Sequence, residues 1–474
     1  MNWTIAIPEI VLSISGLFIL LFGVVQKKEN AFFSCTILSV AAFITVGFLA
    51  LTMPPGGGYL GLFISDNFSR FMKFLIILGG LLSVVLSLDY NEGNNTNQFE
   101  FPVLIIFSTV GAMIMTSACN LMTLYMGLEL SSLALYILCS FDRDNVFSTE
   151  SGVKYFVLGS LASGLLLYGM SLLYGFSGGL GFDDIQRVLT TNSQHSAGFV
   201  IGLVFVLIGL CFKISAVPFH MWTPDVYQGA PTSVTTFLST VPKFATFAVL
   251  LRIMTTSSGF THQWQILIEV IAILSIVIGS IGAIAQINIK RMMAYSSIAH
   301  MGYALIGLAT GTAAGVSAAL IYLASYLFMN VGTFAVIIAM RRKGRFVESI
   351  HDLAGLRKTD SALAVAMAIF MFSMAGVPPL AGFFGKFLVF GAAISAHLMW
   401  LAVIGIVASI IGAFFYLRIV KIMYFDQSVE SFDQRSLSLS FVSFGMGIVT
   451  VGFCLFMRPI MVYGLMAATS LIKM

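Results

Sequence analysis

The sequence predicts an all-α polytopic membrane protein with about 14 transmembrane helices. Of its 474 residues, 58% are hydrophobic and only 9% are charged, which is far more apolar surface than one soluble core could bury. A spanning helix needs roughly 20 consecutive apolar residues, and such windows recur almost from end to end. The windows at 5–25, 71–88 and 199–217 are clear examples.

The spans divide into four parts along the chain. Residues 1–100 are expected to form flanking helices, beginning with 5–25, a retained span that carries Glu9 and has no cleavage pattern. Residues 101–255 and 256–425 are expected to form two inverted repeats of five helices each. Residues 426–474 complete the chain with a C-terminal transmembrane helix.

The repeats are predicted from a short internal similarity. The segment "FKISAVPF" at 212–219 matches "FSMAGVPP" at 372–379, with five helices expected between matched positions, and an odd number inverts the second copy. Pro218 and Pro378 should each break a helix, because proline removes a backbone donor and clashes with the carbonyl four residues earlier. A simple kink that only shapes packing is the competing interpretation of each proline.

Charge and cysteine patterns exclude several classes of function. The net charge of +4 comes from scattered residues, so no nucleic-acid partner is expected. The five cysteines are isolated, the histidines lack the spacing of metal or haem ligands, and "GFSGGLGFDD" at 175–184 is typical of an interhelical turn. The chain is therefore expected to hold no metal or cofactor of its own.

Loop charges predict the orientation. With an external N-terminus, the inner loops at 26–30, 90–100, 141–151, 222–230, 288–292, 341–360 and 418–436 hold 14 of the 24 lysines and arginines. The outer side, with helix ends included, holds six, one of which is Lys473. The positive-inside bias then places both termini on the outer side of the membrane.

Four lysines remain, and all are expected well inside apolar segments: Lys154, Lys213, Lys243 and Lys386. A cation at the bilayer centre costs at least about 2.5 kcal/mol, so these side chains should face a polar interior. Glu129 is placed similarly and is the expected counter-ion. Snorkelling from a helix end, or pairing only for packing, is the competing interpretation for any single lysine.

Buried lysines are suited to proton transfer, because a neighbouring carboxylate can make their protonation adjustable. His300, with Tyr295, Ser296 and Ser297, and more weakly His220, could complete a proton relay with them. A histidine taken alone is more often a hydrogen-bonded structural residue. No redox or nucleotide chemistry is visible, so the energy for ion movement should come from elsewhere.

Four stretches together resemble a known family. They are "YMGLELSSLALYIL" at 125–138, "FKISAVPFHMWTPDVYQGAPT" at 212–232, "KRMMAYSSIAHMGY" at 290–303 and "AGVPPLAGFFGKF" at 375–387. They look like the antiporter-like membrane subunits of respiratory complex I, and most like the subunit N type. The resemblance covers residues 100 to 425 approximately.

The resemblance implies proton pumping driven by electron transfer from NADH to quinone in other subunits, which would carry FMN and iron–sulfur clusters. It assigns roles to six residues. Glu129 and Lys213 would form an ion pair tuned by Lys154, Lys243 would be the central connecting lysine, His300 a relay member, and Lys386 the lysine of the second broken helix.

The implied partners are other complex I membrane subunits, including neighbouring antiporter-like ones, in a bacterial inner membrane. The first rival is a subunit of a multi-subunit cation/proton antiporter, which shares these motifs. A membrane anchor that moves no ions would tolerate neutral residues at all four lysine positions, and a self-contained solute carrier would need a separate substrate pocket.

Overall fold

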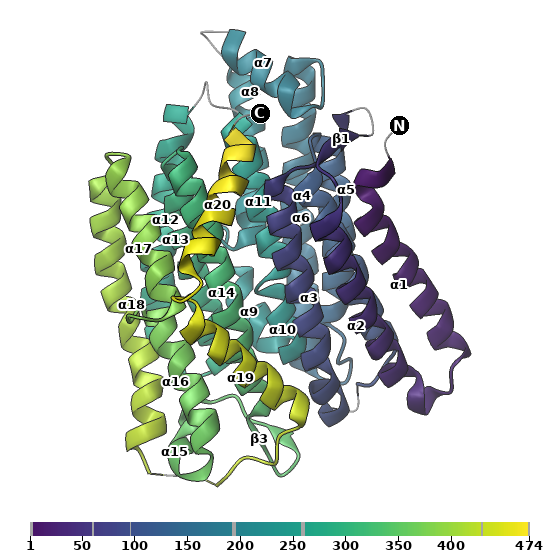
Figure 1. Cartoon of the computed structure of the whole chain (residues 1–474), viewed down its shortest axis with the longest axis vertical. Coiled ribbons are helices and arrows are strands. Elements are labelled where there is room, and N and C mark those ends of the chain that lie inside the picture. The colour runs from purple at the N-terminus through teal and green to yellow at the C-terminus, as the bar shows by residue number, and fades with distance from the viewer. Residues whose placement is uncertain are drawn as a thin grey trace.

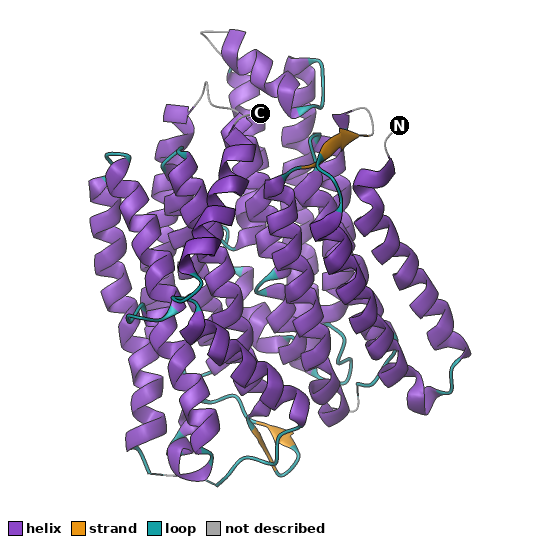
Figure 2. Ribbon diagram, viewed as in Figure 1, coloured by secondary structure: helices purple, strands orange, loops and turns teal. Residues whose placement is uncertain are grey.

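The molecule is a bundle of long helices that run roughly parallel, with short loops at both ends (Figures 1 and 2). The computed structural model describes residues 3–58, 61–94, 96–191, 196–256, 261–427 and 430–472. Lys473, used above for the orientation, lies outside these residues. Within them, eleven helices are long and apolar enough to cross a membrane, or twelve when the bent pair at 437–472 counts as one span. The prediction of an all-α polytopic membrane protein is therefore confirmed, while the count of 14 stays a prediction.

The first part of the bundle contains the flanking helices and those that surround Lys213. These helices are α1 (Ile7–Val25), α2 (Lys28–Thr52), α3 (Asn67–Asn94), α4 (Glu100–Ser117), α5 (Leu121–Cys139), α6 (Val146–Ser177), α7 (Phe182–Thr191), α8 (Ala197–Ile214) and α9 (Trp222–Gly229).

The second part runs from the centre of the bundle to its far edge. Its helices are α10 (Thr232–Leu238), α11 (Val241–Thr256), α12 (Thr261–Ile284), α13 (Ile289–Ala309), α14 (Ala313–Ala339), α15 (Leu356–Thr359), α16 (Ser361–Ala375), α17 (Ala381–Ser395), α18 (Met399–Phe425), α19 (Leu437–Gly452) and α20 (Met457–Ile472). Helices α19 and α20 meet at 88° and pack against α3 and α14.

Two small antiparallel hairpins lie at opposite ends of the bundle (Figure 2). Strands β1 (Gly56–Gly58) and β2 (Phe63–Ser65) form one, and β3 (Arg341–Arg342) and β4 (Arg345–Phe346) form the other. Asp433 accepts hydrogen bonds from the backbone of Lys343 and Gly344 and holds the second hairpin. Single turns of 3-10 helix lie at Trp3–Ala6 and Ile350–Leu353.

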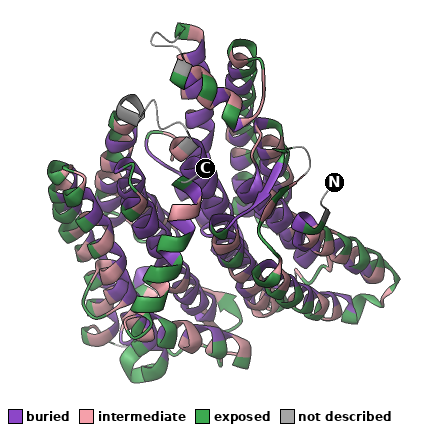
Figure 3. Ribbon diagram, turned by 45° about the horizontal axis from the view of Figure 1, so that its top comes forward, coloured by how far each residue is buried: buried purple, intermediate pink, exposed green. Residues whose placement is uncertain are grey.

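Burial separates the centre of the bundle from its periphery (Figure 3). The span that contains α10 and α11 is completely buried, and α14 is 94% buried, whereas α1, α2, α6 and α18 bury well under half of their spans. The peripheral helices expose large apolar side chains such as Val25 and Ile410, as expected for a surface in contact with lipid or another membrane subunit. Side chains that must avoid lipid therefore belong on the central helices.

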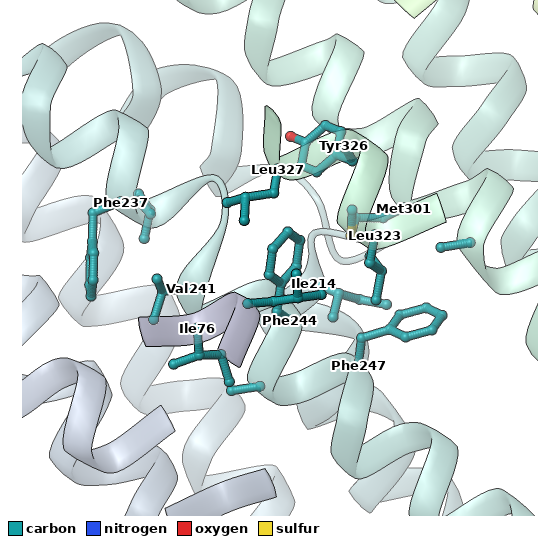
Figure 4. Close-up of a cluster of buried hydrophobic side chains, with 14 of the residues drawn as sticks. Ile76, Ile214, Phe237, Val241, Phe244, Phe247, Met301, Leu323, Tyr326 and Leu327 are labelled. Carbon is teal, nitrogen blue, oxygen red and sulfur yellow. The ribbon is translucent and has the colours of Figure 1, made fainter. Parts of the chain in front are cut away.

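The core of the centre is apolar and tightly packed (Figure 4). Val241, Phe244 and Phe247 of α11 lie with Leu327 of α14 and Ile214, the last residue of α8. All five side chains are fully buried. This cluster leaves no room for water between the central helices, so polar contacts there depend on the few buried polar side chains.

A buried ion pair ties the flanking region to the centre. The Arg252 guanidinium, near the end of α11, donates to both oxygens of Asp66 at 3.1 Å and is 3% exposed. Burial by itself would raise the pKa of Asp66, but the charge and hydrogen bonds of Arg252, with hydrogen bonds from Ser69, outweigh it and leave that pKa below its ordinary value. The C-terminal end of α11 is thus held against the start of α3.

Candidate functional site: a line of buried lysines between two broken helices

The first broken helix lies where Pro218 predicts it. Helix α8 ends at Ile214, Ser215 adopts a left-handed conformation with φ of 64°, and α9 begins at Trp222. The Trp222 indole donates to the Phe212 carbonyl at 3.0 Å, and the amide of Val217 donates to Ser275 at 2.9 Å. Backbone groups released by the break are thus satisfied by side chains, as a membrane interior requires.

Lys213 lies in the last turn of α8, beside this break. Its side chain is 5% exposed, and its ammonium donates to Ser132 Oγ at 2.7 Å and to the Tyr136 hydroxyl at 3.3 Å, both on α5. The rings of Tyr136 and Tyr155 lie 5.4 and 5.7 Å from Nζ, within the range of cation–π attraction. Hydroxyls and aromatic faces therefore replace water around this charge.

Glu129 lies on α5 one turn before Ser132, but it does not touch Lys213. Its Oε1 is buried without a hydrogen-bond partner, and among the described residues the direct Glu129–Lys213 ion pair expected from the sequence is not formed. The carboxylate is close enough for its charge to act on the Lys213 ammonium. Ser132, three residues further along α5, accepts the hydrogen bond from Lys213 instead.

The expected burial of Lys154 is wrong. Lys154 lies near the start of α6, its side chain is 41% exposed, and it pairs with Glu150 at 2.7 Å and with Asp225 at 2.9 Å. Asp225 also accepts from Arg291 at 2.5 Å. The apolar residues that follow Lys154 in the sequence suggested a mid-membrane position, but its place two turns into α6 lets it reach a polar cluster at the end of the bundle.

Lys243 occupies the centre, close to a helix break that was not expected from the sequence. Helices α10 and α11 are separated at Ser239 and Thr240. Lys243 is 0% exposed. Its ammonium donates to Ser297 Oγ at 2.8 Å, and the Tyr326 hydroxyl donates to the same oxygen at 2.8 Å. Ser297 therefore joins α11, α13 and α14 through one atom.

His300 continues the polar contacts one turn further along α13. Its Nδ1 lies 2.6 Å from the Tyr322 hydroxyl, and its Nε2 lies 3.0 Å from the Tyr416 hydroxyl. Tyr416 is in turn 2.5 Å from Ser296 Oγ. A hydroxyl can donate or accept, so both tautomers of the imidazole can be satisfied here, and a proton can leave on the side opposite to its arrival.

The second broken helix holds Lys386 differently. Helix α16 ends at Ala375, Gly376 has φ of 95°, and α17 begins at Ala381. Lys386 reaches back to the end of α16 and donates to the carbonyls of Met374 at 2.9 Å and Ala375 at 3.2 Å. It also donates to Ser409 Oγ at 2.8 Å, and the Tyr303 ring lies 4.8 Å from Nζ.

Tyr322 and Tyr326, rather than the Tyr295 expected from the sequence, make hydrogen bonds around His300 and Ser297. Tyr295 packs against Gly282 of α12 and carries none of the contacts described above. Tyr322 and Tyr326 of α14 carry them instead, and their rings lie 5.9 and 5.1 Å from that of His300. Their spacing of four residues places both on one face of a helix, which is the signal that could have identified them.

His220 lies in the first break, between α8 and α9, and is only partly buried. Its Nδ1 has no hydrogen-bond partner, and it does not join the contacts of Lys213, Lys243 or His300. Within the described part of the chain, no group of three or more histidine, cysteine or acidic residues could hold a metal ion. The arrangement can bind and pass protons along side chains.

Comparisons with known proteins identify this architecture. A family model described as "NADH:quinone oxidoreductase/Mrp antiporter, TM" matches residues 118–412. The chain is 60% identical to NADH-quinone oxidoreductase subunit N of Gluconacetobacter diazotrophicus and 54% identical to that of Granulibacter bethesdensis, in both cases over 100% of each chain.

Solved structures show the same fold. A chain of respiratory complex I from Thermus thermophilus superposes with a TM-score of 0.82 at 29% identity, covering 96% of this chain and 98% of that one. A chain of the Mrp complex from Dietzia has a TM-score of 0.87 at 21% identity, covering 100% of this chain and 98% of that one, a likeness of fold alone. The chain belongs to the family of NADH:quinone oxidoreductase/Mrp antiporter membrane subunits, within its subunit N group.

Proposed function

We propose that the chain is a proton-translocating membrane subunit of an NADH:quinone oxidoreductase, and that protons move along the line Lys213, Lys243, His300 and Lys386. NADH, FMN, the iron–sulfur clusters and quinone would be held by other subunits, so this chain would move charge without redox chemistry of its own. The partners would be other membrane subunits of the complex, including neighbouring antiporter-like ones.

One observation carries the proposal. The contacts Lys243–Ser297–Tyr326 and Tyr322–His300–Tyr416–Ser296 lie between the two broken helices, and Ser296 and Ser297 are adjacent on α13. Ionisable groups inside a membrane are rare and mark ion paths. A buried lysine, a histidine and five hydroxyls in these two neighbouring groups supply a relay that a structural helix bundle would not need.

Three residues beside this relay, Glu129, Lys154 and His220, would regulate it. Glu129 would make the protonation of Lys213 adjustable by its nearby negative charge. Lys154 would set the position of α9, and so of the first break, through Asp225. His220 would be a weaker contributor at the break itself.

The architecture behind this relay is proposed as two inverted repeats of five helices, residues 101–255 and 256–425, flanked by 1–100 and 426–474. Fourteen passes result when α13, the broken pair α16 and α17, and the bent pair α19 and α20 are added to the eleven spans. The membrane would be the bacterial inner membrane, with both termini outside. The hairpin at Arg341–Phe346, rich in cations, would then face inward.

The test is NADH-driven proton pumping in inverted membrane vesicles, measured with a pH-sensitive dye beside the rate of quinone reduction. Lys213→Ala and Glu129→Ala should each lower pumping and coupled quinone reduction in assembled complex. Lys343→Ala is the matched control, because its side chain is 78% exposed on the hairpin. Normal activity in both variants would overturn the proposal, and sodium-driven proton exchange without NADH would favour the antiporter instead.

A further inference from the structure

A groove outside the relay lies at the end of the bundle where α4 begins and α5 ends. Its volume is about 940 Å³, and it is lined by α1, α4, α5 and the loops before α4 and after α5. Phe107 on its floor packs near Gly16 of α1. No residue of the groove belongs to the lysine line.

The groove is polar at its mouth. Glu100 is in the first turn of α4, and Asp142, Arg143 and Asp144 follow α5. The mouth therefore holds three carboxylates and one guanidinium. One oxygen of Glu100, Oε2, is buried and has no hydrogen-bond partner, and the start of the helix favours its negative charge. The mouth is thus complementary to a positively charged hydrogen-bond donor.

The groove becomes apolar with depth. Leu104 and Phe107 lie one and two turns further along α4, and Leu20 of α1 and Ile137 of α5 form the walls. Phe107 is seven residues beyond Glu100, a rise of roughly 10 Å along the helix. Ile137 is 52% exposed, so the apolar part opens sideways on the surface that faces the membrane.

We propose that this groove binds one phospholipid with a primary-amine headgroup, of the phosphatidylethanolamine class. The ammonium would donate hydrogen bonds to Glu100 and its acidic neighbours, Arg143 would contact the phosphate, and an acyl chain would lie along Leu104 and Phe107. A choline headgroup has no N–H to donate, and an anionic glycerol headgroup would meet an excess of carboxylates. The charge at the mouth therefore selects among membrane lipids.

The experiment uses the intact complex, purified in mild detergent, stripped of lipid and titrated with phosphatidylethanolamine, phosphatidylcholine or phosphatidylglycerol. Native mass spectrometry counts the lipid bound to this chain. Glu100→Gln should weaken phosphatidylethanolamine binding roughly tenfold, since a hydrogen bond to a charged group contributes about 1.5 kcal/mol or more. Glu29→Gln, an exposed carboxylate at the start of α2 outside the groove, should bind as the parent does.

Asp144→Asn serves as a second variant, because this exposed loop position can change without disturbing the helices. It should reduce the preference for phosphatidylethanolamine over phosphatidylcholine, while assembly on a native gel stays normal. Equal binding of all three lipids by the parent complex, or unchanged binding in both variants, would overturn the proposal. Binding to the isolated chain but not to the complex would also overturn it, since another subunit would then occupy the groove.

Discussion

The two broken helices hold their lysines in opposite ways. Lys213 belongs to the segment before its break and is bound by hydroxyls of another helix, Ser132 and Tyr136. Lys386 belongs to the segment after its break and is bound by the carbonyls of Met374 and Ala375. The same device, an interrupted helix, therefore produces two different chemical environments.

The difference has a chemical consequence. Carbonyls only accept hydrogen bonds, and those at the end of α16 also carry the negative end of the helix dipole. A neutral Lys386 would keep only two N–H groups for its two carbonyls and would lose the attraction of its charge to that end of the dipole, whereas the hydroxyls around Lys213 can rotate to donate to a neutral amine. We expect Lys213 to change protonation during turnover and Lys386 to hold a fixed charge for a larger share of the cycle.

The largest effect should come from the residue that joins the two regions. Lys243→Met removes the only ammonium that contacts Ser297 among the described residues, so protons should no longer pass between the halves. Because a positioned acid–base group contributes roughly a hundredfold or more, NADH-driven pumping should fall to near background. Lys28→Met, at an exposed helix start, is the control, and pumping above a tenth of the parental rate would contradict a single connected line.

Substitution by arginine should distinguish the roles of Lys213 and Lys386, because its effect on pumping should differ between them. An arginine stays protonated in proteins, so Lys213→Arg should lower pumping about tenfold or more if that site must lose its proton. Lys386→Arg can still donate to both carbonyls and should retain more activity. Pumping assayed in parallel vesicles compares them, and a greater loss in Lys386→Arg would reverse the assignment of the two environments.

Removing one serine hydroxyl from each site should give a smaller difference in pumping rate between the two sites. Ser132→Ala leaves Lys213 with only the longer hydrogen bond, to Tyr136, and should slow pumping roughly fivefold, as expected for a hydrogen bond worth about 1 kcal/mol. Ser409→Ala leaves Lys386 with two carbonyls and should change the rate little. Both variants remove one hydroxyl from a buried contact, so each controls for the other, and equal losses would show that the carbonyls do not compensate.

The smallest effect is expected for Glu129→Asp. The charge survives but the side chain is one methylene shorter, and since Glu129 already acts without direct contact, pumping should fall only about twofold, a change of roughly 0.4 kcal/mol. Glu129→Gln keeps the reach and removes the charge. A Gln variant as active as the Asp variant would mean that the carboxylate positions Lys213 without acting through charge.

Several features of this protein could be predicted from the sequence alone, because each has a local cause. Apolar runs of about 20 residues indicate spans because the bilayer sets their length, and proline interrupts a helix through its own ring and missing donor. Lys213, Lys243 and Lys386 stood out because an unneutralised charge in hydrocarbon is costly wherever the chain folds.

Tertiary structure alone decided which groups meet. Lys154 and Asp225 are 71 positions apart, and His300 and Tyr416 are 116 apart. Neither contact could therefore be predicted from the local sequence pattern. The break at Ser239 and Thr240 and the exposure of Lys154 depend on how α6, α9 and α14 pack. The sequence marked which side chains are costly to bury, and only the packing of distant helices determined what surrounds each of them.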